Sequence, residues 1–130
     1  TVQGWTERGR EVPYFTTMGG TFERATGQQP FLLANAYSAS EARINRNVVY
    51  NFVTTNDIIG GNSGSPVIDR EGAVIGAAFD GNIHSLGGAF GYDGRMNRTV
   101  VVSTAAIQEA LTNIYPNPGI VSELATRRRR

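Results

Sequence analysis

The sequence lacks cysteine and lysine altogether and has a single histidine in 130 residues. Without cysteine, disulfide bonds, thiolate catalysis and cysteine-based zinc sites are excluded. Without lysine, a phosphate-binding P-loop is excluded, because that motif needs a lysine after its glycines. No apolar run reaches the length of a membrane-spanning helix. We therefore predict no cofactor, no metal and no membrane span.

Net charge is also small. The formal net charge is +1, and four of the 12 basic residues form the terminal run Arg127 to Arg130. The remaining 8 basic residues face 11 acidic ones, so the body of the chain is mildly acidic. This balance argues against a nucleic-acid partner. We interpret the arginine run as a solvated tail.

What the chain does contain is glycine, with 16 residues, and short apolar runs rich in β-branched side chains. Its length suits one domain, and this composition predicts a β-rich fold with many turns. A helix is expected at 103–115, ended by Pro116. Segment 19–47 is expected to be largely irregular, with one weak helical candidate at 40–43, and 81–94 to be a surface loop. The expected strands are 1–5 and 12–18, forming a hairpin around the turn 6–10, and 48–54, 66–68, 73–79 and 99–102.

The segment IIGGNSGSPVID, residues 58–69, places Ser63 between glycines on a bend that returns at once to a strand. The nucleophile elbow of an α/β-hydrolase needs G-x-S-x-G before a helix, whereas Ser65 fills the fifth position here and a strand follows. The pattern instead resembles the serine turn of trypsin-like peptidases, G-[DN]-S-G-[GS]-P. A structural glycine turn with an idle serine is the remaining alternative.

The trypsin-like interpretation gives each residue of the bend a chemical role. The Ser63 hydroxyl would attack a carbonyl carbon, while the backbone amides of Gly61 and Ser63 would bind the oxyanion that forms. Gly61 lets the backbone approach the substrate without a Cβ, and Gly64 relieves crowding on the other side. Pro66 fixes φ where the chain re-enters the sheet.

Two side chains near the bend test how far this interpretation extends. Asn62 stands where many trypsin-like enzymes carry an aspartate that pairs with a newly cut N-terminus, and an amide cannot form that ion pair. The hexapeptide also occurs in bacterial glutamyl endopeptidases, so it selects no subfamily. Asp57 occupies the position at the base of the trypsin specificity pocket, or supports the bend as an Asx turn.

Residues 54–90, TTNDIIGGNSGSPVIDREGAVIGAAFDGNIHSLGGAF, closely resemble the catalytic-serine end of the bacterial dipeptidyl-peptidases of family S46. The upstream segment 4–27, GWTERGREVPYFTTMGGTFERATG, is similar to the part that precedes it in that family. The resemblance implies an all-β, chymotrypsin-like second β-barrel with a C-terminal α-helix over residues 1–115, then a tail at 116–130. It also implies a serine dipeptidyl-peptidase that releases dipeptides from free N-termini.

The same resemblance assigns roles to the residues after the bend. Ser63 would be the nucleophile, and Asp80 would hold the ammonium group of the substrate, although Asp80 as a simple turn cap is the alternative. Phe79 and Gly81 would contact the substrate. Gly81 stands where members that prefer acidic P1 residues carry an arginine, so we expect a hydrophobic P1 residue.

His84 lies downstream of the serine, whereas trypsin-like chains run His, Asp, Ser, so we expect it to be a loop residue.

The chain begins at Thr1 without a methionine or signal sequence, which suggests a piece of a longer protein, inactive alone. Its expected partners are peptides with a free N-terminus and the absent first barrel and helical domain; a homodimer is left open. The family implies a periplasmic or secreted location. The alternative functions are a glutamyl-type endopeptidase and a non-catalytic trypsin-like binding module.

Overall fold

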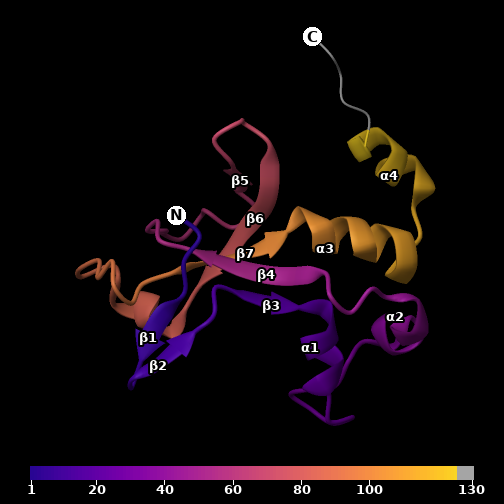
Figure 1. The fold of residues 1–130 in the computed structure, drawn as a ribbon, viewed down its shortest axis with the longest axis horizontal. Helices are drawn as coiled ribbons and strands as arrows, with labels where there is room; N and C mark the ends of the chain where they lie inside the picture. Colours follow the sequence, from indigo (N-terminus) through magenta and orange to yellow (C-terminus); the bar gives the residue numbers. More distant parts are fainter. Residues whose placement is uncertain (126–130) are drawn as a thin grey trace.

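A five-stranded antiparallel sheet organises residues 1–125, the part of the chain that this computed structural model describes (Figure 1). The strand order is β3-β4-β7-β6-β5. The two longest strands, β4 and β6, therefore lie on either side of the central strand β7. A separate two-stranded hairpin precedes it. The strands are β1 (Trp5–Glu7), β2 (Arg10–Val12), β3 (Phe15–Thr17), β4 (Val49–Thr54), β5 (Pro66–Ile68), β6 (Val74–Gly81) and β7 (Thr99–Ser103).

Alternation of side chains explains why β7 takes the central position. Thr99, Val101 and Ser103 point to the buried face, while Val100 and Val102 between them are only partly buried. β-branched residues with this period of two suit a strand that has neighbours on both sides. Gly76 of β6 allows close packing, because a Cβ there would lie 2.5 Å from Val101 Cγ1.

The sheet stays open within residues 1–125, since no pairing joins its edge strands β3 and β5. The expectation of antiparallel β-structure followed by a helix is confirmed at this level. The expected closed barrel is not found, and the described fold is not all-β. Each edge strand has only three residues, which offers few hydrogen bonds for closing the sheet on itself.

The N-terminal hairpin differs in register from the prediction. β1 pairs with β2 around Arg8 and Gly9, whose φ angles of 50° and 75° give the two-residue turn that a tight hairpin favours. The expected second strand, 12–18, is split, because Pro13 separates β2 from β3. β3 then joins the main sheet beside β4.

Helices cover more of the chain than the sequence predicted. The helix expected at 103–115 is confirmed as α3 followed by a wider π-helical turn, η3. Ser103 caps it by accepting a 3.0 Å bond from the Ala106 N–H. The expected irregular segment contains α1 and α2, whereas η1 lies on the weak helical candidate at 40–43, and the expected tail contains α4. The bounds are α1 (Met18–Glu23), α2 (Asn35–Ser38), η1 (Glu41–Arg43), η2 (Ile83–Gly87), α3 (Thr104–Glu109), η3 (Ala110–Ile114) and α4 (Pro118–Ala125).

The main apolar core lies between these helices and the sheet. Met18, Ile44, Ala106 and Ile114 are all buried and form one cluster. Tyr37 contributes at its edge, where burial, followed by the hydrogen bond to the Tyr50 hydroxyl, raises the pKa of the phenol. The two missed helices α1 and α2, which contribute Met18 and Tyr37 to this cluster and its edge, are therefore held by tertiary packing rather than by strong local signals.

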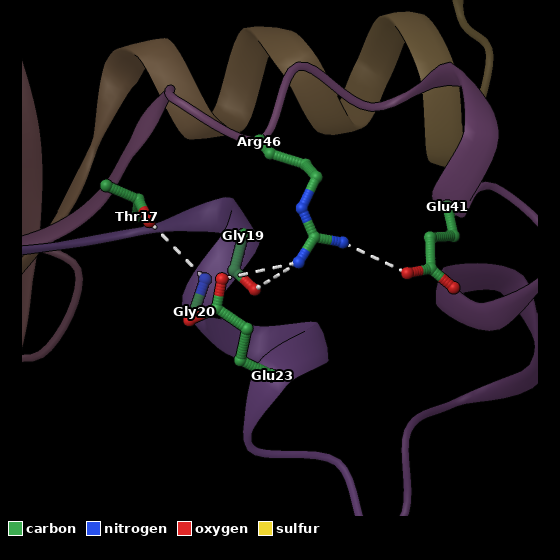
Figure 2. Close-up of polar contacts among 6 residues, drawn as sticks. All are labelled: Thr17, Gly19, Gly20, Glu23, Glu41 and Arg46. Atoms are coloured by element: carbon green, nitrogen blue, oxygen red, sulfur yellow. Dashed lines mark hydrogen bonds and ion pairs between the residues drawn. The ribbon is translucent and has the colours of Figure 1, made fainter.

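Arg46 fastens α1 to the segment that leads into β4 (Figure 2). Its guanidinium lies 3.0 Å from Glu41 Oε1 and 3.4 Å from Glu23 Oε1. Gly19 permits this arrangement, because a Cβ there would lie 3.0 Å from the Arg46 carbonyl oxygen. Thr17 caps the helix by accepting a 3.3 Å bond from the Gly20 N–H. Since these ion pairs are partly exposed, each contributes under about 1 kcal/mol.

No helix in the described range 1–125 is long and apolar enough to cross a membrane. Within the same range no cluster of three or more His, Asp or Glu side chains could hold a metal ion. The predicted solvated run Arg127 to Arg130 lies outside the described residues.

Candidate active site

The glycine-rich bend connects β4 to β5 and is ordered by Asn62. The Asn62 side-chain oxygen accepts a 2.8 Å bond from the Ile59 N–H, and the Asn62 N–H donates to the Ile59 carbonyl at 3.1 Å. The Asn62 carbonyl accepts from the Ser65 N–H at 3.0 Å. An asparagine here thus builds the turn by itself, without the ion pair that an aspartate would make.

The glycines of the bend adopt a backbone conformation that other residues rarely reach. Gly61 has a φ of 101° and Gly64 a φ of 86°, both in the left-handed region. Two bonds then fix the bend to β6: the Gly64 N–H donates to the Ala78 carbonyl at 2.7 Å, and the Ala78 N–H donates to Ser65 at 2.9 Å. The position of Ser63 relative to β6 is therefore set by the sheet itself.

The Ser63 side chain is exposed and lies against the rim of β6. Its hydroxyl donates a long bond of 3.3 Å to the Phe79 carbonyl oxygen. Across residues 1–125, the backbone N–H groups of Gly61 and Ser63 donate to no acceptor. The hydroxyl predicted to be the nucleophile is thus accessible, and the two predicted oxyanion donors are uncommitted.

A bulge in β6 presents the residues that follow. Ala78 pairs with Val101 and Asp80 with Val100, so Phe79 is an extra residue without a partner in the ladder. Such a bulge changes the direction of neighbouring side chains and frees backbone groups. Here it leaves the Phe79 carbonyl available to Ser63.

Ser63 opens onto a pocket of about 230 Å³. Four of the five predicted site residues line it, namely Ser63, Phe79, Asp80 and Gly81. The fifth, Gly61, does not line the pocket, but its neighbour Gly60 does. A larger cavity of about 920 Å³ lies between the N-terminal hairpin and residues 94–98, but it contains none of the predicted residues. The other lining residues of the smaller pocket are Ile58, Ile59, Asn82, Ser85 and Leu86.

Asp80 is exposed at the mouth of this pocket. One carboxylate oxygen accepts a 2.8 Å bond from the N–H of Gly81, the next residue of β6. No cation in the described range pairs with the carboxylate. The second oxygen therefore remains available for a positively charged ligand.

Gly81 is required here by close packing rather than by its φ angle. A Cβ at this position would lie 2.8 Å from the Ser85 Cβ. Ser85 is held by Asn82, whose side-chain oxygen accepts from the Ser85 N–H at 3.2 Å and from the Ser85 hydroxyl at 2.9 Å. Sequence reasoning missed both Asn82 and Ser85, although asparagine is a favoured helix N-cap residue and Asn82 is the N-cap of η2.

His84 and Asp57 do not line the pocket. The His84 Nε2 lies 3.7 Å from Glu7 Oε1, and the ring meets the edge of Trp5 with centroids 6.3 Å apart. His84 thus packs against the N-terminal hairpin. Asp57 accepts a 2.9 Å bond from the Ile58 N–H rather than from the Ile59 N–H that an Asx turn would use, and the Ile59 N–H donates to Asn62 instead.

The sequence profile of one family, peptidase S46, matches residues 1–126. The chain belongs to the peptidase S46 family. A dipeptidyl-peptidase 7 from Phocaeicola vulgatus is 41% identical over 103 residues, which cover 72% of this chain and 14% of that protein. A dipeptidyl-peptidase 7 from Capnocytophaga gingivalis is 55% identical over 73 residues, covering 56% of this chain and 10% of that protein. This S46 chain thus spans a small part of these relatives.

Solved structures agree with the S46 assignment at the level of the fold. The crystal structure of Porphyromonas endodontalis DPP11 in an alternate conformation superposes with a TM-score of 0.84 at 20% identity. The match covers 97% of this chain and 20% of that one. The same enzyme in complex with the dipeptide Arg-Asp gives a TM-score of 0.86 at 20% identity, covering 95% and 19%. The S46 chain therefore has the fold of one segment of a much larger molecule.

Proposed function

We propose that this chain is the catalytic-serine segment of a longer S46 serine peptidase that releases dipeptides from the free N-termini of peptides. The observation that carries the proposal is the exposed Ser63 hydroxyl beside a pocket, with the Gly61 and Ser63 amides uncommitted. The names of the sequence relatives support the dipeptidyl activity. Their larger size supports a longer parent protein.

In the proposed acylation step, the Ser63 Oγ attacks the carbonyl carbon of the second peptide bond of the substrate. A general base outside this chain takes the hydroxyl proton, and the carbonyl oxygen becomes an oxyanion held by the Gly61 and Ser63 N–H groups. The C–N bond then breaks, and the departing amine receives the proton. Water hydrolyses the resulting ester, which releases the dipeptide and restores Ser63.

Asp80 supplies the recognition of the substrate terminus in this proposal. An ammonium group pairs well with a carboxylate, and such a charge-assisted bond compensates for the water that both groups lose. Asp80 lines the same pocket as Ser63, which suits a substrate whose N-terminus lies two residues from the cleaved bond. Phe79 and the bare backbone of Gly81 leave the pocket without a positive charge, so a hydrophobic P1 residue is favoured.

In this proposal the open sheet of this chain belongs to the second barrel of a chymotrypsin-like pair, and its partners are the first barrel and a helical domain of the same protein. Apolar side chains that line the pocket support this: the exposed fractions are 78% for Ile59 and 77% for Leu86. Exposed apolar groups gathered at one place mark a contact surface. We propose a periplasmic or secreted location for the longer protein, and a homodimer of it stays open.

The test is hydrolysis of fluorogenic dipeptidyl substrates by the full-length protein. Ser63→Ala is expected to lower kcat by at least about 10³-fold, since the nucleophile is lost. Ser38→Ala, an exposed serine on α2, is the matched control and should leave kcat unchanged. Faster cleavage of N-acetylated than of free-amine substrates would replace the proposal with an endopeptidase. Full activity of Ser63→Ala would leave a non-catalytic binding module as the better account of this segment.

A further inference from the structure

The wall of the pocket behind Gly81 is formed by Ser85, at the centre of η2. Both residues line the pocket that contains Ser63. The space next to Gly81 is already occupied, because the nearest atom to a Cβ built there is the Ser85 Cβ at 2.8 Å, followed by the Ser85 Oγ at 3.3 Å. The width of the pocket at this point is thus set by two facing residues rather than by Gly81 alone.

The Ser85 hydroxyl is engaged by the protein rather than left for a ligand. It donates to Asn82 Oδ1 at 2.9 Å, lies 3.2 Å from the Arg98 carbonyl oxygen, and accepts from the Arg98 N–H at 3.2 Å. Because these contacts use the single hydrogen and one lone pair of the hydroxyl, Ser85 has no hydrogen left to donate to a substrate, and its Cβ contributes to the pocket wall as an apolar group.

Asn82 and Arg98 hold this wall in a fixed position. The Asn82 side chain also donates to the Met96 carbonyl at 2.8 Å, and the Asn82 N–H donates to the Arg98 carbonyl at 2.9 Å. Arg98 itself is 1% exposed, and its guanidinium donates to backbone carbonyls, including Gly4 at 2.7 Å. A wall anchored to buried backbone cannot yield easily to a larger ligand.

We propose that Ser85 is a specificity-determining residue, which together with Gly81 sets the size of the P1 side chain that the pocket accepts. The inference rests on the proposed dipeptidyl-peptidase function and assigns the substrate-size limit to a residue outside the glycine-serine bend. A consequence is that position 81 cannot be enlarged without displacing Ser85.

The experiment measures kcat/KM of the full-length protein for two dipeptidyl substrates, one with a bulky P1 residue, leucine, and one with alanine. Ser85→Val adds carbon to the wall. It should lower the ratio of kcat/KM for the leucine substrate to kcat/KM for the alanine substrate by about tenfold or more, as expected when methyl groups compete for one apolar site. Ser85→Ala keeps the Cβ and should leave that ratio within about threefold. Ser85→Thr adds one methyl group while retaining the hydroxyl, and should shift the ratio in the same direction by less.

A second arm tests the contact with Gly81. Gly81→Ala should lower kcat/KM for the leucine substrate, and adding Ser85→Gly to that variant should recover most of the loss, whereas adding Ser85→Ala should not. Labelling of Ser63 by a fluorophosphonate reports whether each variant retains a folded site. If the Ser85→Val protein is not labelled, its site is not folded. Ser85→Thr is then measured in its place, so the prediction stays testable.

The outcomes separate the two proposals. If the unaltered protein releases no dipeptide from either substrate, the proposed function fails and this inference falls with it. If it releases dipeptides but labelled Ser85→Val and Ser85→Thr keep the original ratio, or lose both activities equally, only the role of Ser85 is overturned. Additive effects of Gly81→Ala and Ser85→Gly would also overturn it, because facing residues must be coupled.

Discussion

Gly61→Ala is the substitution that bears most directly on the proposed oxyanion site. Nothing lies within 4 Å of a Cβ built at Gly61, so the change causes no collision. Its φ of 101° is nevertheless one that alanine rarely adopts, and holding alanine there costs on the order of 1–2 kcal/mol. The backbone relieves this strain by rotating, which moves the Gly61 N–H away from the oxyanion.

Loss of one oxyanion donor lowers kcat by about 10²–10³-fold, or roughly 3–4 kcal/mol of transition-state stabilisation. KM should change little, because the oxyanion exists only in the transition state. The assay is steady-state hydrolysis of dipeptidyl substrates by the full-length protein. A selective fall in kcat is the expected signature.

Two other glycines of the chain provide matched controls. Gly60 also has open space around a Cβ but no positive φ, so Gly60→Ala adds the same methyl group without the strain. Gly72 has a φ of 81° and open space, but lies in the turn of the β5–β6 hairpin, which extends from the body of the sheet in Figure 1. Gly72→Ala should lower stability and leave kcat intact. If Gly61→Ala keeps the kcat of Gly60→Ala, the amide of Gly61 plays no part in catalysis.

Two further predictions concern charges. Asp80→Asn should lower kcat/KM for free-amine substrates at least about tenfold, because the ammonium loses its ionic partner, while N-acetylated substrates are unaffected; an equal loss on both would assign Asp80 to the fold. Arg98→Met should destabilise its surroundings by about 3–5 kcal/mol, since the buried carbonyls that the guanidinium satisfies lose their donor. Hydrogen exchange of β1 and residues 94–98 in the full-length protein should accelerate, whereas Arg95→Met, at a side chain 89% exposed, should not change it.

Strands with a clear alternating pattern were predictable from the sequence. The segments 48–54 and 99–102 became β4 and β7, because their β-branched and aromatic residues suit neighbouring strands in one sheet. The hairpin at the N-terminus was predicted with the wrong strands. Its two-residue turn includes Arg8 at a φ of 50°, and nothing in the sequence marks an arginine for that conformation.

The α-helices between β3 and β4, α1 and α2, were not predictable from local pattern, whereas η1 lies on the weak helical candidate at 40–43. α2 has four residues and no side-chain cap, so its sequence carries little helical signal. It forms because Ala36 and Tyr37 pack against the buried cluster that includes Met18 and Ile44. A contact between such distant segments leaves no mark in a short window of sequence.

The glycine-serine bend was predictable, but the frame around it was not. Gly64 was predicted to relieve crowding, whereas a Cβ at Gly61 or Gly64 would meet nothing within 4 Å, and the structure needs glycine at both positions for their positive φ angles. The bulge at Phe79 depends on how β6 pairs with β7, and the place of Ser85 depends on Asn82 and Arg98. These features arise from tertiary register, which a single strand's residues do not encode.

One strand accounts for the spacing of the whole proposed site. The bend is fastened to β6 at Ala78, the next residue contacts Ser63, and Asp80 follows within the same bulge. Two extended residues of a substrate span about 7 Å, so in the proposed function a carboxylate that lines the same pocket as the nucleophile suits a dipeptide better than a longer acyl group. A shift of β6 against β7 would change the distance between Asp80 and Ser63, so under the proposed function the length of the released peptide would depend on the sheet as much as on the two side chains.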